Sequence, residues 1–419
     1  MLPTGKRNVQ LPGQPDRAAH DHRFEHKSTS ELLRSLLVLR LCTSPLSHHG
    51  PDLLRAQPWL AASCAEHFTA GAERADAWAQ MNKLKAHGLS AILDAADPFN
   101  PPVGHLHSLL AAINTASAMP TQGFAIVRPR RLADPEALRR TASALAAGAP
   151  LDDAERQCLA SMDQRLQQLA QHAATRGVKL LLEDLDGPHL GPVLSALLPP
   201  LLRAVNSVGA EALAAGRPAA PAEARLFLPY AVGAAGALQR LTRDLETAQS
   251  EGYVLGAKLV GNGSDAPSTW SACLERLLEA AQAGRAEVML AAARRGEVEA
   301  AVAALARAGL SPEAAPVAFV QPLGVADHLG FSLGRHGYRV YKTCPYGKAE
   351  DVRPALLQHM QDASWASHED ARLAQAELWS RLLSDPLAAA AARVLGARQQ
   401  RSSAGASGGR SDANQPMAS

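Results

Sequence analysis

The sequence predicts a (β/α)8 barrel with a helical extension at its N-terminus. Three observations carry this prediction. Eight short apolar segments recur along the chain, helical sequence follows each of them, and 419 residues suffice for one large α/β domain with extensions. An open doubly wound sheet is the alternative, but no glycine fingerprint for a nucleotide marks such a sheet. The eight segments span residues 90–96, 124–129, 178–184, 224–230, 254–260, 286–292, 317–323 and 337–343.

Helical sequence precedes the first apolar segment. Ser28 and Glu31 form a capping-box pattern in front of the apolar run LLRSLLVLRL. Further helices are expected over residues 53–65 and 74–86. The chain is therefore expected to divide into a disordered arm (1–24), a helical region (25–86), the barrel (87–385) and a low-complexity, disordered tail (386–419).

The stretch over residues 317–357 predicts a strand, a helix and a second, parallel strand. Gly337 is expected to end the helix, because glycine commonly follows the last helical turn. The loop Thr343–Gly347 should follow the second strand. Ligands of such barrels bind at the loops after the strands, so this loop is a candidate part of a binding site.

Composition excludes several classes of protein. Lys and Arg number 42 against 40 Asp and Glu, a balance that does not favour nucleic-acid binding. The five cysteines include no CxxC pair, so a disulfide framework or zinc site is not expected, and no other metal-site pattern is present. No apolar run reaches transmembrane length. The N-terminal residues match a mitochondrial presequence only weakly.

Several motifs together resemble the eukaryotic, FAD-dependent proline dehydrogenases. The resemblance implies a (β/α)8 barrel that binds FAD noncovalently. Such an enzyme transfers a hydride from C5 of L-proline to the flavin, yields pyrroline-5-carboxylate and passes electrons to quinone at the mitochondrial inner membrane. The motifs are SELLRSLLVLRLC (30–42), HFTAGAE (67–73), GLSAILD (88–94), EGYVLGAKLV (251–260) and LGVADHLGFSLGRHGYRVYKTCPYG (323–347).

The resemblance also assigns candidate site residues. Arg128 stands where the family has a lysine at the end of the second strand, and Asp184 matches a catalytic-pocket aspartate at the end of the third. A shift of one residue would place Glu183 there instead. Lys258 and Asp362 match residues that contact the cofactor. Arg128 and Asp184 are thus the predicted catalytic residues, and Lys258 and Asp362 the predicted cofactor-binding residues.

Other positions depart from the family pattern. Gln358 and His359 replace an Arg pair that binds the proline carboxylate, and His359 could restore part of the charge only if protonated. Thr343 replaces a tyrosine that packs against the substrate. Each lost charge-assisted contact costs roughly 2–5 kcal/mol. Two alternatives therefore remain beside proline oxidation: a catalytically degenerate barrel with a regulatory or assembly role, and an FAD enzyme acting on another amine.

Overall fold

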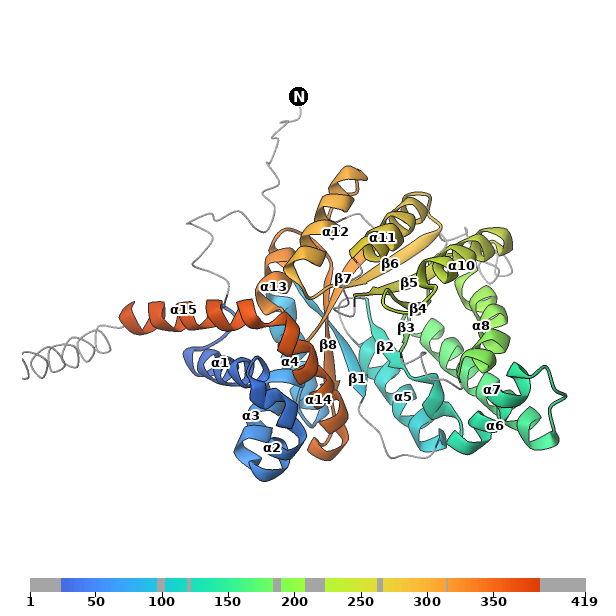
Figure 1. Ribbon diagram of the computed structural model, residues 1–419, viewed down its shortest axis with the longest axis horizontal. Helices are drawn as coiled ribbons and strands as arrows, with labels where there is room; N and C mark the ends of the chain where they lie inside the picture. The colour runs from blue at the N-terminus through green and yellow to red at the C-terminus, as the bar shows by residue number, and fades with distance from the viewer. Residues whose placement is uncertain are drawn as a thin grey trace, which may run out of the picture.

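The computed structural model describes residues 24–95, 102–118, 122–183, 190–207, 223–261, 267–313 and 316–384. Eight parallel strands, paired in chain order, close into a barrel with helices around it (Figure 1). Each predicted apolar segment overlaps one strand, so the predicted fold class is confirmed. The strands are β1 (Ser90–Ala95), β2 (Phe124–Val127), β3 (Lys179–Leu182), β4 (Leu226–Ala231), β5 (Leu255–Val260), β6 (Ala286–Ala291), β7 (Val317–Pro322) and β8 (Val340–Tyr346).

Strand β8 closes the barrel against β1 and runs further than the sequence predicts. Its pairing with β1 continues to Tyr346, so the expected loop over residues 343–347 is wrong for all but its last residue. The pairing with β7 ends at Thr343. Pro345 can therefore occupy the strand, because its missing N–H removes no bond to β7. Gly337 does end the preceding helix, with φ of 83°.

Alternate residues of the strands fill the barrel interior in layers. Aromatic rings close the amino-terminal end, where Phe124 makes edge contacts with Phe227 and Tyr341 at centroid distances of 5.6 and 5.1 Å. Apolar side chains, including Ile126 and Leu181, form the next layer. The period of two then places polar side chains at the carboxyl-terminal ends of β1, β2, β3, β5 and β8.

Helices cover the outside of the barrel and extend it at the N-terminus. The helix predicted over 53–65 is divided in two, because Pro58 lacks the N–H that would continue it. Within the described residues no helix has the length and apolar character needed to cross a membrane. The α-helices are α1 (Thr29–Cys42), α2 (Gly50–Ala56), α3 (Pro58–Phe68), α4 (Arg74–Ala86), α5 (Pro102–Ser117), α6 (Pro135–Ala146), α7 (Asp153–Thr175), α8 (Gly191–Asn206), α10 (Ala237–Glu251), α11 (Pro267–Gln282), α12 (Arg295–Arg307), α13 (Asp327–Arg335), α14 (Ala349–Ala366) and α15 (His368–Ser384); short 3-10 turns are η2 (Pro45–His49) and η3 (Pro129–Leu132).

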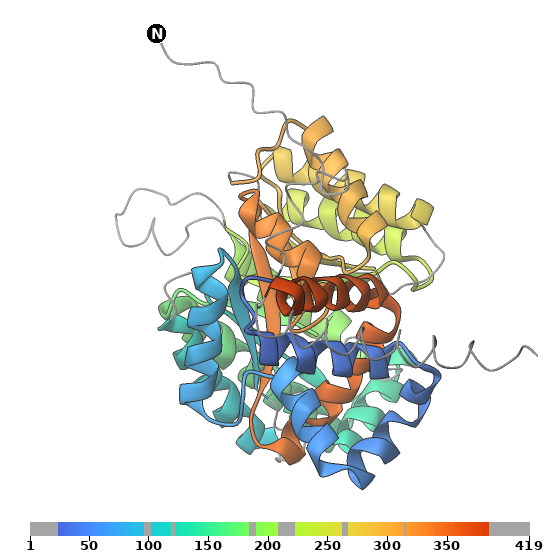
Figure 2. The same cartoon turned by 90° about the vertical axis from the view of Figure 1, so that its left-hand side faces the viewer.

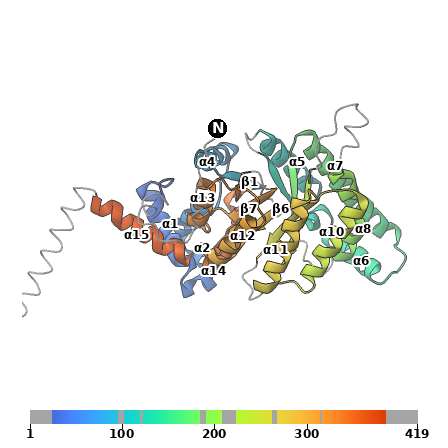
Figure 3. The ribbon, with the colours of Figure 1, turned by 90° about the horizontal axis from the view of Figure 1, so that it is seen from above.

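The two ends of the described chain pack together. Helix α15 lies beside α1, as Figures 2 and 3 show from two directions. The predicted capping box of α1 is confirmed: the Ser28 backbone N–H donates to Glu31 Oε2 at 2.7 Å, and the Glu31 N–H donates to Ser28 Oγ at 3.2 Å. Arg381 of α15 donates to the carbonyl oxygens of Phe24 and Lys27 at 2.9 and 2.7 Å. The Arg381 contacts fix the segment before α1 on helix α15.

A buried imidazole joins α13 to α15. His328 Nδ1 lies 2.6 Å from Asp370 Oδ1, and its Nε2 lies 3.2 Å from Glu369 Oε2. Burial by itself lowers the pKa of His328, but the two carboxylates outweigh burial and raise this pKa to about 9. The imidazole is therefore charged at neutral pH and holds the two helices together.

The stability of the protein should fall as the pH rises above neutrality. Unfolded histidine has a pKa near 6.5, so the contribution of His328 is complete below that pH and is lost as the pH passes 9. The shift corresponds to at most about 3 kcal/mol. Denaturant unfolding at pH 6 and at pH 9.5 should show this loss. His328→Asn should reduce the difference, and the control His336→Asn, at an exposed position, should not. An undiminished difference in His328→Asn would contradict the assignment.

Candidate active site

Two ion pairs occupy the carboxyl-terminal end of the barrel. The first joins the ends of β1 and β2: Arg128 Nη1 and Nη2 donate to Asp94 Oδ1 and Oδ2, both at 2.6 Å. Burial alone would raise the pKa of Asp94, but the adjacent guanidinium holds it below its usual range. The bidentate geometry fixes the plane of the guanidinium. The predicted catalytic residue Arg128 thus lies at the expected end of the barrel.

The second ion pair joins β5 to the end of β3. The Lys258 ammonium pairs with the Glu183 carboxylate, and both side chains are largely buried. Period-two alternation from Leu181, which belongs to the interior cluster, explains why Glu183 faces inward. The predicted catalytic residue Asp184 lies outside the described residues. Glu183, the alternative from a one-residue shift, is the carboxylate that meets Lys258.

Helix α14 follows β8 and brings Asp362 toward the same end of the barrel. Asp362 Oδ1 accepts a hydrogen bond from Gln358 Nε2 at 3.1 Å, so the predicted helical spacing is confirmed. Burial raises the pKa of Asp362 to about 6, although Gln358 and the positive charge of Lys258 both act to lower it. Lys258, the other predicted cofactor-binding residue, thus acts on this carboxyl group through its charge.

His359 carries no positive charge at neutral pH. Burial lowers its pKa to about 4, while the nearby Asp94 carboxylate and a hydrogen bond to the Phe68 backbone act in the opposite direction. Its Nδ1 is buried and has no hydrogen-bond partner among the described residues. The imidazole therefore does not replace a lost guanidinium, and the idea that protonation restores that charge is not supported.

Sequence reasoning missed one cation at this face. Arg294 follows the end of β6, and its guanidinium stacks on the Trp365 ring of α14, with Cζ 4.9 Å from the centroid. Burial raises the pKa of Glu297, and the positive charge of Arg294 acts to lower it. A basic residue shortly after the end of a barrel strand was the available signal.

The residues at this end fit a flavin dinucleotide in three respects. Lys258 and Arg294 would supply positive charge for phosphates or a reduced flavin, and Asp362 would supply an acceptor for ribose hydroxyl groups. The apolar layer beneath the ion pairs provides an apolar surface against which an aromatic ring system could pack. Groups of His, Cys, Asp and Glu arranged to hold a metal ion do not occur among the described residues.

Comparisons with known proteins define the class of this barrel first. Two PutA proteins of known structure share the fold: that of Bdellovibrio bacteriovorus, with a TM-score of 0.61 and 12% identity, and that of Bradyrhizobium japonicum, with a TM-score of 0.55 and 15% identity. Each match covers 86% of this chain, which spans only 40% and 42% of those longer chains. No family model matches the sequence. The chain thus shares the (β/α)8-barrel fold of these proteins.

Curated relatives then narrow the assignment. Hydroxyproline dehydrogenase of Rattus norvegicus is 28% identical, over 86% of this chain and 93% of the relative. Proline dehydrogenase 1, mitochondrial, of Bos taurus is 30% identical, over 51% of this chain and 36% of the relative. The chain is a relative of the eukaryotic hydroxyproline and proline dehydrogenases, and the resemblance inferred from its motifs is confirmed.

Proposed function

We propose that this protein oxidises a cyclic secondary amino acid, L-proline or its hydroxylated form, to the corresponding pyrroline carboxylate. The observation that carries the proposal is the pair of buried ion pairs, Arg128–Asp94 and Lys258–Glu183, at the carboxyl-terminal end of the barrel. Both pairs place their charges at the end of the barrel where ligands of this fold bind, and a barrel without a ligand would gain little from desolvating them there. The degenerate-barrel alternative is for this reason not favoured.

Bound FAD would supply the acceptor for the hydride that leaves the ring carbon next to nitrogen. Lys258, Arg294 and Asp362 would hold this cofactor. Through FAD the electrons would pass to quinone, and the location would be mitochondrial, as the resemblance implies. These assignments rest on the charges described above and on the relatives named proline dehydrogenase 1, mitochondrial.

Arg128 would bind the substrate carboxylate. A guanidinium is a positively charged, planar donor that suits a carboxylate, and the bidentate pair with Asp94 fixes its plane. Asp94 keeps the guanidinium oriented and, because it is ionised, also balances its charge until the substrate arrives. The neutral His359 beside this pair leaves Arg128 with a larger share of carboxylate binding than it would have beside an Arg pair.

Thr343 favours the hydroxylated substrate. It lies at the inward-facing position of β8 where the resemblance places a tyrosine that packs against proline. A threonine leaves more space and offers a hydroxyl group that can hydrogen-bond a substrate hydroxyl. The mammalian relatives named hydroxyproline dehydrogenase match 81–86% of this chain, whereas those named proline dehydrogenase 1 match 49–53%. Both observations support hydroxyproline as the preferred substrate.

The visible spectrum of the purified protein tests this function. The protein, reconstituted with FAD under anaerobic conditions, should show the flavin band and lose it when hydroxyproline or proline is added. Hydroxyproline should bleach the band at the lower concentration. A protein that binds no FAD contradicts the proposal. A flavin that pyrrolidine bleaches, while neither amino acid does, would instead indicate an amine without a carboxylate as the substrate.

A further inference from the structure

The loop between β7 and α13, residues 323–326, contains a strained backbone. Ala326 is buried and adopts φ of 52° and ψ of 38°, in the left-handed region. Among the described residues it is the sole non-glycine residue with positive φ. This conformation costs an L-residue roughly 1–2 kcal/mol. Such strain persists only where surrounding contacts hold the backbone, and it is common near functional sites.

A buried lysine on β8 holds this loop. Lys342 is 0% exposed, and its Nζ donates to the Val325 carbonyl oxygen at 2.8 Å and to Gln321 Oε1 at 3.1 Å. Nζ also lies 3.0 Å from Asp327 Oδ1. A lysine is almost never fully buried unless its ammonium is paired. These contacts satisfy the ammonium, and they connect β7, the strained loop and α13 to β8.

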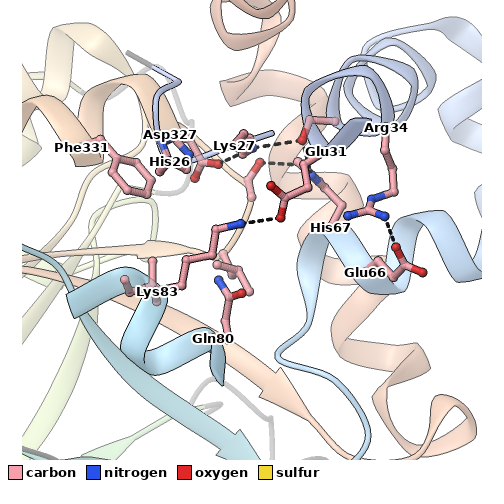
Figure 4. A pocket seen from close by; sticks show the side chains of 14 residues that line it. His26, Lys27, Glu31, Arg34, Glu66, His67, Gln80, Lys83, Asp327 and Phe331 are labelled. Atoms are coloured by element: carbon pink, nitrogen blue, oxygen red, sulfur yellow. Dashed lines mark hydrogen bonds and ion pairs between the residues drawn. The ribbon is translucent and has the colours of Figure 1, made fainter. Parts of the chain in front are cut away.

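The contacts of Lys342 with Val325, Gln321 and Asp327 form a network. The segment before α1 adds Lys27 to this network. Lys27 Nζ pairs with Asp327 Oδ2 at 2.9 Å beside a cavity of about 60 Å³, and the His26 ring stacks on Phe331 at 3.6 Å (Figure 4). Burial alone would raise the pKa of Asp327, but Lys27 and Lys342 hold it well below its usual range. The carboxylate is therefore shared between two ammonium groups.

The network ends on the backbone of the candidate site. Lys342 directly precedes Thr343, whose carbonyl oxygen accepts a hydrogen bond from the Leu323 N–H at 3.0 Å. Gln321 Nε2 donates to the Ala292 carbonyl oxygen at 2.9 Å, just beyond the end of β6. Both contacts lie at the carboxyl-terminal ends of β6, β7 and β8, which form part of the candidate site. A shift of the ammonium would thus move three strand ends together.

We propose that Lys342 is a positioning residue for the site: through Val325, Gln321 and Asp327 it holds the strained loop and the end of β8, and so sets the position of Thr343. The expected effect on turnover rests on the proposed function. The contacts of Lys342 do not depend on that function. Misplacement of a reacting group by about 1 Å can cost 10²-fold in rate. Removal of the ammonium should therefore affect turnover more than folding.

Lys342→Met and Lys179→Met form a matched pair for the test. Lys179 is a second buried lysine of the barrel, paired with Glu287 at 2.7 Å, but it lies at the amino-terminal end of β3, away from the site. In Lys342→Met the Asp327 carboxylate retains Lys27, so the variant is expected to fold. We expect kcat/KM per bound flavin to fall by about 10- to 100-fold in Lys342→Met and by less than about 2-fold in Lys179→Met.

Hydrogen exchange supplies a readout that does not depend on activity. Peptides covering residues 323–326 and 340–347 should exchange faster in Lys342→Met than in Lys179→Met at equal global stability. Equal exchange in these peptides, or equal loss of turnover in both variants, would overturn the proposal. If the wild-type protein oxidises no amino acid, the proposed function fails while the exchange data still decide whether Lys342 holds the loop. If Lys342→Met does not fold, Lys27→Met and the conservative Lys27→Arg replace it, and only the methionine variant should loosen the loop.

Discussion

Replacement of Arg128 by glutamine is expected to lower kcat/KM for proline and hydroxyproline by about 30-fold to several thousand-fold. The change removes the guanidinium proposed to bind the substrate carboxylate. It also leaves Asp94, 7% exposed, without its bidentate partner. The loss should be largest for substrates with a carboxylate and small for pyrrolidine, which has none. Anaerobic flavin reduction by each compound measures this difference.

Arg203→Gln is the matched control for this experiment. Arg203 of α8 also forms a bidentate pair, with Glu251 at 3.1 and 2.6 Å, but this pair lies on the outer surface. Exposed pairs contribute little, so this variant should keep wild-type kinetics. Arg128→Lys should retain part of the carboxylate binding, since it keeps the charge and loses the fork. If Arg128→Gln slowed the reaction of pyrrolidine as much as that of proline, the assigned role would be wrong.

Replacement of Lys258 by methionine should weaken FAD binding by about 30-fold to several thousand-fold. Lys258 carries the positive charge on the interior of β5, and its removal leaves Glu183 as an unbalanced negative group in the same place. A negative group repels both the phosphates and a reduced, anionic flavin. The flavin content of the purified variant and the thermal stabilisation produced by added FAD report the change without any turnover measurement.

Lys179→Met serves again as the control for Lys258→Met, because it removes a buried lysine charge from the opposite end of the barrel. It should bind FAD as the wild-type protein does. A second comparison, Glu183→Gln, retains the ammonium and should bind FAD at least as tightly as Lys258→Met. Full flavin content in Lys258→Met would remove Lys258 from the cofactor site.

The candidate site was predictable where a charged residue stands at the end of a strand that is itself evident from sequence. Arg128 follows the apolar run of β2, and Lys258 interrupts that of β5. Strand period and barrel geometry together place such residues at the carboxyl-terminal end. The third strand shows the limit, because the order Glu183–Asp184 does not reveal which carboxylate faces inward. Only the observed register, with Leu181 inside, places Glu183 there.

The sequence by itself determined the eight strands, the helical N-terminus, the family and the charged residues at two strand ends, because these follow from local apolar spacing and from motifs read along the chain. The tertiary structure alone decided which charges meet. Asp94 and Arg128 are 34 positions apart, Glu183 and Lys258 are 75 apart, and Lys27 and Asp327 are 300 apart. Pairing, the burial that leaves His359 neutral, and the enclosure of the Lys342 side chain depend on distance and solvent exclusion in three dimensions, which local sequence does not encode.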